Sequence, residues 1–282
     1  MLLIGISSSI LFEYAYQKLR KKRITVNDGT AAVTGMLMGL SLPVTAPFWA
    51  LLLGTAFAII VVKQLGGGTG RNLFNPAVSA RVMLKVFFTP WITNWVLPGG
   101  GVDAVSTATP LEFIGHTART VSPEVPSLWN LFLGIDLGGN VGETSKLLII
   151  IGMIYLVVQK IITPAIPLLY IGTLAIIMFL YSGFNVDFMM THVLSGTLFF
   201  AAVFMATDYS SGALTLKGKM FFAVGCGLLT AFLRIVFNLP GGVGFAIIAM
   251  NMIAPWLDKQ CTPRIYGHEK IIRIRGSREP HS

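Results

Sequence analysis

The stretch SKLLIIIGMIYLVVQKIITPAIPLLYIGTLAIIMFLY, residues 145–181, decides the fold class of this chain. It contains two apolar runs, 145–160 and 165–181, with a short corner between them. Apolar runs of about 15–20 residues suit membrane helices rather than the roughly 10-residue alternating strands of a membrane barrel. A helix also satisfies its own backbone polar groups, as lipid requires. We therefore predict an all-α polytopic membrane protein.

The same pattern recurs along the chain. Of its 282 residues, 54% are hydrophobic and 12% are charged, whereas a soluble domain averages about 25% charged residues. We predict about nine transmembrane helices, some of them short or broken, in a single integral membrane domain that covers 1–282. The predicted helices are 1–16, 29–42, 47–63, 76–89, 145–160, 165–181, 192–206, 220–238 and 243–257.

The positions of Lys and Arg predict how these helices are oriented. If the basic run 17–28 is cytoplasmic and the helices alternate, sixteen of the 21 Lys and Arg residues fall on the cytoplasmic side. This is the asymmetry of the positive-inside rule. It predicts a multi-pass protein of the inner or plasma membrane, with a cytoplasmic basic tail at 258–282 and a long extracytoplasmic loop at 90–144. The net charge of +9 is then a feature of topology, and we expect lipid, not nucleic acid, around the chain.

Three polar residues at predicted helix ends are candidate site residues. Asn75 stands before a proline and is predicted to cap the helix 76–89; alternatively, it lines a flavin or ion site. Thr207 and Asp208 follow the helix 192–206, where they form either a solvated turn or part of an ion route. We expect His192 to cap the start of that same helix.

Other ionisable residues are less informative. Arg81 and Arg234 fall within predicted helices and therefore need partners or a wet cavity. Cys226 and Cys261 form neither a CxxC motif nor a Cys/His cluster. We therefore predict no metal site and no catalytic residue in this chain.

The long loop contains the sequence DAVSTAT, residues 103–109, followed by Pro110 and Glu112. On physical grounds, Thr109 is suited to cap a helix that begins at Pro110, with Glu112 completing a capping box. A phosphate is also bound well at such a helix N-terminus.

This loop sequence resembles the flavinylation motif D-x-x-(S/T)-x-A-T, in which a transferase links FMN through its phosphate to the final threonine. The resemblance implies that Thr109 carries a covalent FMN and that Asp103, Ser106 and Ala108 are recognition residues. It also explains the lack of a dinucleotide-binding fingerprint, because a covalent link replaces a large binding fold.

Five further stretches resemble motifs of the Rnf and Nqr membrane subunits, and they occur in the same order along nearly the whole chain. The match is incomplete in one stretch, where two prolines of the family motif are replaced by Tyr209 and Ala213. The stretches are GGGTGRNLFNPA (66–77), GNVGETS (139–145), FMATDYSSGALTLKGK (204–219), GGVGFAIIAMN (241–251) and TPRIYG (262–267).

The chain thus resembles the RnfD family, which is similar to NqrB of the sodium-pumping NADH:quinone reductase. The resemblance implies a flavoprotein subunit of an ion-translocating ferredoxin:NAD oxidoreductase (the Rnf complex), not catalytic alone, that couples electron transfer to sodium or proton movement. It implies as partners the membrane subunits RnfA and RnfE, the flavin protein RnfG and the iron–sulfur proteins RnfB and RnfC. A second, non-covalent flavin such as riboflavin is left open. The alternatives are a component of the quinone reductase, or a secondary transporter or scaffold without a cofactor.

Overall fold

The computed structural model describes residues 1–96, 106–107, 111, 114–115, 120–121, 125–135 and 137–262. Within these ranges the chain is helical apart from four strands of two residues each. Asp103, Ala108 and Thr109 lie outside the described residues, and of Ser106 the backbone alone is described.

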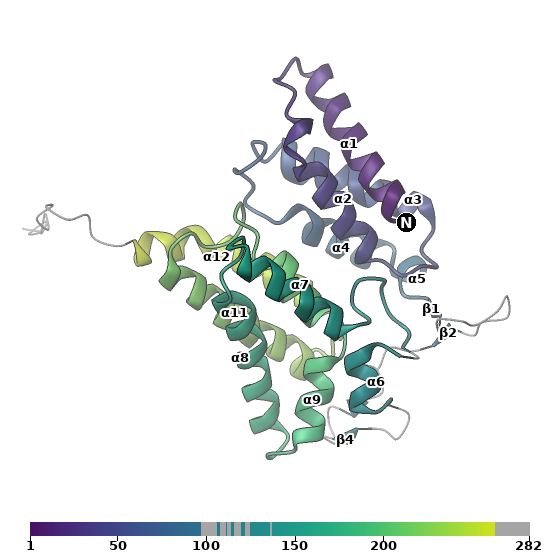
Figure 1. Ribbon diagram of the computed structural model, residues 1–282, viewed down its shortest axis with the longest axis vertical. Coiled ribbons are helices and arrows are strands. Elements are labelled where there is room, and N and C mark those ends of the chain that lie inside the picture. The colour runs from purple at the N-terminus through teal and green to yellow at the C-terminus, as the bar shows by residue number, and fades with distance from the viewer. Residues whose placement is uncertain are drawn as a thin grey trace, which may run out of the picture.

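Elements α1 to α5 form a first group of helices, the upper part of Figure 1. In this group α1 packs against α2 and α3, and α3 runs directly into the π-helix η2. α4 joins this group to the rest of the protein, because it contacts α2 and α3 as well as α12. The elements are α1 (Leu2–Leu19), η1 (Val26–Asp28), α2 (Thr30–Leu40), α3 (Phe48–Ala56), η2 (Phe57–Gln64), α4 (Pro76–Phe87) and α5 (Thr89–Ile92).

Elements α6 to α12 form the second group, the lower part of Figure 1. Here α11 packs against α8 and α12, and α9 packs against α6 and α8. The elements are α6 (Leu128–Leu133), α7 (Lys146–Val158), α8 (Ala165–Tyr181), α9 (Val186–Leu194), α10 (Leu198–Phe200), the π-helix η3 (Ala201–Met205), α11 (Leu216–Val236) and α12 (Gly242–Cys261).

The four strands pair as two short antiparallel ladders in the connection between α5 and α6. β1 (Trp95–Val96) pairs with β2 (Ser106–Thr107), so that Trp95 is opposite Thr107. β3 (Ile114–Gly115) pairs with β4 (Thr120–Val121), so that Ile114 is opposite Val121. The second ladder places part of the predicted 90–144 loop against α9, through β4 (Figure 1).

Small residues allow close contact between helices in the first group. α1 and α2 cross at Gly5 and Gly35, where a Cβ atom on Gly5 would lie 2.5 Å from the Gly35 carbonyl oxygen. A side chain at either position would separate the two backbones. Glycine at both positions is therefore required by this crossing, as in many membrane helix pairs.

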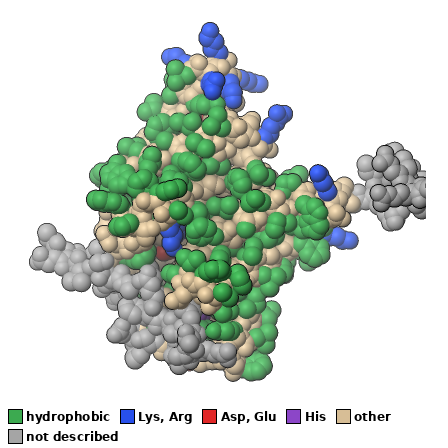
Figure 2. All heavy atoms as spheres, turned by 180° about the vertical axis from the view of Figure 1, so that it is seen from behind, with side chains coloured by type: hydrophobic (Ala, Val, Ile, Leu, Met, Phe, Trp, Pro, Cys, Tyr) green, Lys and Arg blue, Asp and Glu red, His purple; other side chains and the backbone are tan. Residues whose placement is uncertain are grey.

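The exterior of the protein carries many large hydrophobic side chains, although its core is hydrophobic as well. Large hydrophobic side chains such as Leu3, Phe87 and Val158 are exposed. In Figure 2, hydrophobic patches are spread over the visible face, and most of the Lys and Arg side chains lie at its top and at one side. Charged groups such as Glu13, Lys63 and Arg234 are instead buried. An extensive apolar exterior with ionisable residues inside is typical of a helical membrane protein.

Among the described residues, α11 is the one helix that is both long and apolar enough to cross a membrane by itself. The pair formed by α9 and α10–η3 passes the same criterion as a single span bent by 59°. Four shorter apolar segments are Thr30–Leu40, Phe48–Gln64, Lys146–Val158 and Ala165–Tyr181. The helical architecture agrees with the predicted fold class, and the number of nine spans stays a prediction.

The predicted helix 192–206 is wrong in its boundaries. The helix α9 begins at Val186, and the chain then breaks at Ser195 and Gly196 before α10. Gly196 has a φ of +71°, which glycine adopts without strain. His192 therefore lies in the last turn of α9 and does not cap a helix start.

Candidate functional site

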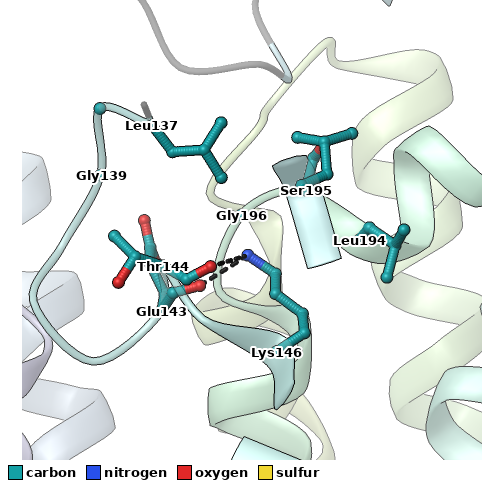
Figure 3. Close-up of a pocket in the computed structure, with 10 residues that line it drawn as sticks. Leu137, Gly139, Glu143, Thr144, Lys146, Leu194, Ser195 and Gly196 are labelled. Atoms are coloured by element: carbon teal, nitrogen blue, oxygen red, sulfur yellow. Dashed lines mark hydrogen bonds between the residues drawn. The ribbon is translucent and has the colours of Figure 1, made fainter. Parts of the chain in front are cut away.

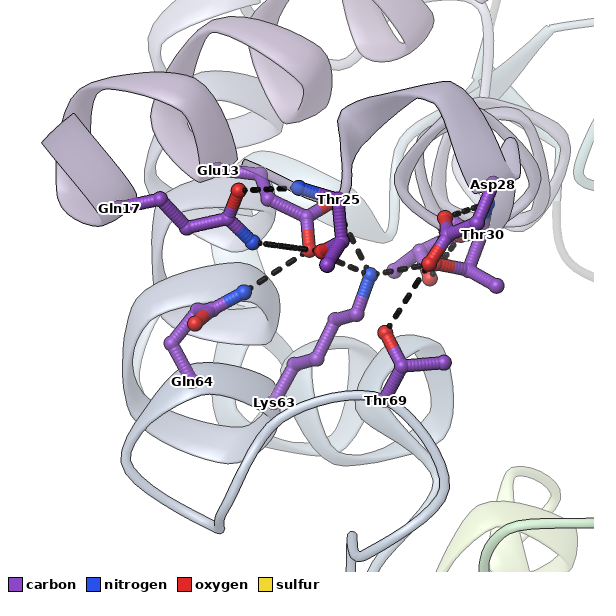
Figure 4. A network of polar contacts seen from close by, with 9 residues as sticks. Glu13, Gln17, Thr25, Asp28, Thr30, Lys63, Gln64 and Thr69 are labelled. Atoms are coloured by element: carbon purple, nitrogen blue, oxygen red, sulfur yellow. Dashed lines mark hydrogen bonds and ion pairs between the residues drawn. The ribbon is translucent and has the colours of Figure 1, made fainter. Parts of the chain in front are cut away.

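A fully buried ion pair joins α1 to the end of η2. Lys63 Nζ lies 2.8 Å from Glu13 Oε1, and the two side chains are 2% and 0% exposed. The same ammonium donates to Thr30 Oγ1 at 2.6 Å, and Gln64 Nε2 donates to Glu13 Oε1 at 2.8 Å. Figure 4 shows these side chains converging from three elements. The added hydrogen bonds satisfy the two buried charges, as a buried pair requires.

A cavity of about 690 Å³ adjoins this ion pair, with Lys63 in its wall. One side comes from α2, the loop after η2 and the start of α4, and the other side comes from the end of α7 and from η3. The cavity thus lies between the two groups of helices, and most of its lining is apolar. Its polar lining residues are Asp28, Thr30, Thr34, Lys63, Thr69, Asn72, Asn75, Thr207, Asp208, Tyr209 and Ser210.

Both π-helices reach this cavity. η2 contributes Lys63 and η3 contributes Val203 and Phe204. A π-helical turn is rare and is found frequently at functional sites, because it shifts the side chains that follow it. The presence of one π-helix in each wall therefore supports the cavity as the functional site.

Asn75 caps α4, which confirms the sequence-based prediction. Its Oδ1 accepts from Val78 N at 3.1 Å, while its Nδ2 donates to Met205 O at 3.0 Å. Asn75 is buried, and its side chain therefore joins the start of α4 to the end of η3. With its amide oriented to suit its neighbours, Asn251 of α12 accepts from Asn75 N at 3.1 Å.

Thr207 and Asp208 lie in the cavity wall, just after η3. Thr207 Oγ1 donates to Val203 O at 2.6 Å. The Asp208 carboxylate accepts from Ser210 Oγ and Ser211 Oγ, both at 2.8 Å to Oδ2. The nearby cation Lys219 is directed elsewhere, with Nζ 5.8 Å above the Tyr209 ring. The structure thus brings together Asn75, Thr207 and Asp208, which the sequence suggested separately.

A second carboxylate, Asp28, lies at the rim of the same cavity. Its Oδ1 accepts from Thr30 N at 2.9 Å and from Thr30 Oγ1 at 2.6 Å, and Thr69 Oγ1 donates to Oδ2 at 3.3 Å. Burial raises the pKa of Asp28, but these hydrogen bonds and the charge of Lys63 outweigh it and hold the pKa below its ordinary value. Asp28 is therefore a carboxylate at neutral pH.

A further polar cluster lies where α7 begins. Lys146 Nζ donates to Glu143 O at 2.6 Å, and the Glu143 carboxylate lies 3.7 Å from Arg81 Nη2. Figure 3 shows Glu143, Thr144 and Lys146 facing Ser195 and Gly196 across a small cavity. That cavity holds about 20 Å³, enough for one water molecule. Arg81, which the sequence left without a partner, thus pairs with Glu143.

Arg234 is buried beside this cluster. Its Nη1 donates to His192 O at 2.6 Å, so it satisfies a carbonyl in the last turn of α9. A Cβ atom on Gly196 would lie 3.7 Å from Arg234 Nη2 and 3.8 Å from Leu111 Cδ2. Leu111 is 1% exposed and follows Thr109 by two residues in the sequence. Leu111, in the connection between α5 and α6, is therefore buried next to Arg234.

The sequence-based reasoning missed Glu13 and Lys63 as site residues. Glu13 falls within an apolar helix, and an ionisable residue there is a signal of function. Lys63 stands at the end of an apolar run, where the positive-inside rule assigns it to a cytoplasmic turn. Its burial depends on a partner 50 residues away, which no local pattern reveals.

Comparison with known proteins places these residues in a family. The family model described as "NQR2, RnfD, RnfE family" matches residues 1–267. The chain is 40% identical over 272 residues to the D subunit of the Na(+)-translocating ferredoxin:NAD(+) oxidoreductase complex of Acetobacterium woodii, and the match covers 95% of this chain and 82% of the relative. It is 36% identical over 276 residues to the D subunit of the proton-translocating ferredoxin:NAD(+) oxidoreductase complex of Clostridium ljungdahlii, and the match covers 95% of this chain and 83% of the relative. The D subunit of an ion-translocating oxidoreductase complex of Escherichia coli is 33% identical to this chain over 306 residues, and the match covers 95% of this chain and 87% of the relative.

Proposed function

The chain belongs to the NQR2, RnfD, RnfE family, and from this premise we propose that it is the flavin-bearing membrane subunit of an ion-translocating ferredoxin:NAD oxidoreductase complex. Relatives that are similar over 95% of the chain are named as subunits of such complexes. The observation that carries the proposal is the cavity between the two helix groups, which is lined by residues of both π-helices, among them Lys63 of the buried ion pair.

In this proposal FMN is linked through its phosphate to Thr109, and Asp103, Ser106 and Ala108 are read by the transferase. The DAVSTAT sequence supports this assignment. Leu111 adds support, because it anchors the loop next to a buried guanidinium, a suitable environment for a phosphate ester. Bound there, FMN supplies one- and two-electron transfer. The loop would be extracytoplasmic.

The cavity is suited to a second, non-covalent flavin such as riboflavin. An isoalloxazine ring has an apolar dimethylbenzene end and a polar pyrimidine end, and the cavity has apolar walls with Asn72, Asn75 and Lys63 at one side. Its volume of about 690 Å³ is within the range of small-molecule sites. Asn72, whose Oδ1 is buried without a hydrogen-bond partner, would hydrogen-bond the polar end of the ring next to Asn75.

Thr207 and Asp208 are proposed to belong to the route of the translocated cation, sodium or proton. They lie in the wall of the same cavity as Lys63, so the charge of a bound flavin and the charge of a cation on Asp208 would influence each other at short range. The partner proteins RnfA, RnfB, RnfC, RnfE and RnfG would supply the iron–sulfur and nicotinamide sites. The proposed place of the chain is the inner or plasma membrane, with the cavity open towards the cytoplasm.

The test of the covalent flavin is intact-peptide mass spectrometry of the Thr109 segment after denaturing purification from a host that has the transferase. We expect a mass increase of one FMN less water, and its loss in Thr109→Ala. Ser106→Ala is the matched variant, since it changes the recognition sequence but keeps the acceptor hydroxyl. An unmodified Thr109 in the native, assembled complex would remove the covalent redox role.

The second flavin is tested by extraction with acid after purification in detergent. We expect unphosphorylated riboflavin in the extract of the parent protein and much less in Asn72→Ala. Thr34, on α2, also lines the cavity. Thr34→Ala is therefore the control, because it shortens a lining side chain but leaves the Asn72 amide in place. Equal riboflavin in all three extracts would exclude the cavity as its site.

A further inference from the structure

The cluster at the start of α7 has an excess of buried positive charge. Arg81 Nη2 lies 3.7 Å from the Glu143 carboxylate, Lys146 Nζ donates to Glu143 O at 2.6 Å, and Arg234 is close enough to feel the charge of the same carboxylate. The side chain of Arg81 is 19% exposed and that of Glu143 is 8% exposed, while Lys146 and Arg234 are 3% and 0% exposed. Within the described residues, three cations thus share one anion. Buried charge without an opposite charge is costly.

Arg234 also has hydrogen-bond donors that nothing in the described part of the chain accepts. Its Nη1 is bound to His192 O, but Nε and Nη2 are buried and have no partner there. Oγ of Ser195, in the break between α9 and α10, is likewise buried without a partner. The Nε–H and Nη2–H groups lie on one edge of the planar guanidinium, and this edge matches the paired oxygens of a carboxylate or phosphate.

Gly196, in the break between α9 and α10, is a close neighbour of the fully buried Arg234. Gly196 lines the small cavity of about 20 Å³, and a Cβ atom on it would lie 3.7 Å from Arg234 Nη2, in van der Waals contact. The same position is 3.8 Å from Leu111. The N-terminus of α7, with Ser145 as its cap, adds a positive dipole end on the side of Lys146.

We propose that Arg234, Arg81 and Lys146 form a binding site for a phosphodiester monoanion. A water molecule would fill donors but would not reduce the positive charge, and a metal cation would increase it. A phosphodiester supplies one negative charge and two unesterified oxygens, which suit the Nε and Nη2 edge of Arg234. Such a group has two sources in this setting: the FMN–threonine ester, which rests on the proposed function, or the headgroup of a phospholipid.

The experiment is a comparison of thermal unfolding midpoints in detergent, which does not depend on activity. Flavinylated protein is compared with Thr109→Val, each with Arg234 intact and with Arg234→Gln. Delipidated Thr109→Val protein is then titrated with phosphatidylglycerol and with a neutral glycolipid. Arg71→Gln, an exposed arginine in the loop after η2, is the control for loss of a positive charge.

We expect flavinylation to raise the midpoint by about 3 °C or more in the parent and in Arg71→Gln, but not in Arg234→Gln. If mass spectrometry finds no flavin on Thr109, an increase with phosphatidylglycerol that requires Arg234 still supports the site, although the flavin assignment has failed. If Arg234→Gln does not fold, Arg81→Gln and Arg234→Lys take its place. Each is expected to reduce the rise in the unfolding midpoint that flavinylation or phosphatidylglycerol causes. The proposed site would be overturned if the unfolding midpoint rose equally in the parent and in these variants, both on flavinylation and on addition of phosphatidylglycerol.

Discussion

Lys63 Nζ lies 2.8 Å from Glu13 Oε1, and Lys63 is also one of the residues that line the large cavity. The pair connects α1 to the end of the π-helix η2. Its charges therefore hold the first helix in place and also face whatever occupies the cavity. A residue with both contacts links the stability of the fold to the function of the site.

Removing one member of this pair is expected to destabilise the protein strongly. Lys63→Met leaves the Glu13 carboxylate buried without a cation and should reduce the free energy of unfolding by about 3–5 kcal/mol. The double variant Glu13→Leu with Lys63→Met should be more stable than Lys63→Met alone, since no isolated charge is then left. Thermal unfolding in detergent measures both. Additive losses in the double variant would show that the pair does not interact.

The crossing of α1 and α2 predicts opposite effects for two Gly→Ala substitutions. In Gly35→Ala the new methyl group would overlap the Gly5 carbonyl oxygen, so we expect a loss of about 1–3 kcal/mol. In Gly172→Ala, within α8, nothing lies within 4 Å of the new atom, and alanine should stabilise the helix by about 0.5–1 kcal/mol. Unfolding midpoints in one detergent provide the comparison. A stabilised Gly35→Ala variant would contradict the close crossing.

Much of the helical framework could be predicted from the sequence, because long apolar runs end at polar corners. The predicted range 165–181 has the same bounds as α8, and the predicted 76–89 exceeds α4 by two residues. The break at Ser195 could not be predicted, since small residues also occur inside membrane helices. Neither π-helix is visible in the apolar pattern, because one extra residue in a turn does not change composition.

The sequence predicts the candidate site as separate residues but not as a cavity. Asn75 and Asp208 each stand at a helix end, where local signals are strong. That they line one cavity depends on a long-range contact, the hydrogen bond from Asn75 at the start of α4 to Met205 O at the end of η3. The burial of Glu13, Lys63 and Arg234 depends in the same way on residues far away in the sequence, and no alternation or cap signal reports it.

Asn75 is predicted to contribute more than its helix cap. Asn75→Ser keeps an N-cap oxygen but loses the Nδ2 donor to Met205 O, so a buried carbonyl loses a hydrogen bond at a cost of about 1–3 kcal/mol. Asn185 caps α9 through Phe188 N at 3.2 Å, and Asn185→Ser should be nearly neutral, because Asn and Ser cap equally well. Both variants are compared by thermal unfolding. Equal, small effects would mean that the contact with Met205 O contributes nothing.

Asp258 of α12 is predicted to hold the start of α11. Its carboxylate accepts from Leu214 N at 2.9 Å and from Thr215 N at 3.2 Å, and Thr215 is the N-cap of α11. Asp258→Ala removes both charge-assisted hydrogen bonds and should cost about 2–3 kcal/mol, because each is worth more than a neutral one.

Asp187→Ala is the matched control for this prediction. Asp187 is an acidic residue in the first turn of α9, where its charge favours the helix N-terminus by about 0.3–1 kcal/mol. Hydrogen exchange at the backbone amides of Leu214 and Thr215 gives a local measurement beside global unfolding. We expect faster exchange at both amides in Asp258→Ala and unchanged exchange in Asp187→Ala. Protection that persists in Asp258→Ala would mean that the turn before α11 is held by other contacts, since an amide that has lost its acceptor exchanges as soon as water reaches it.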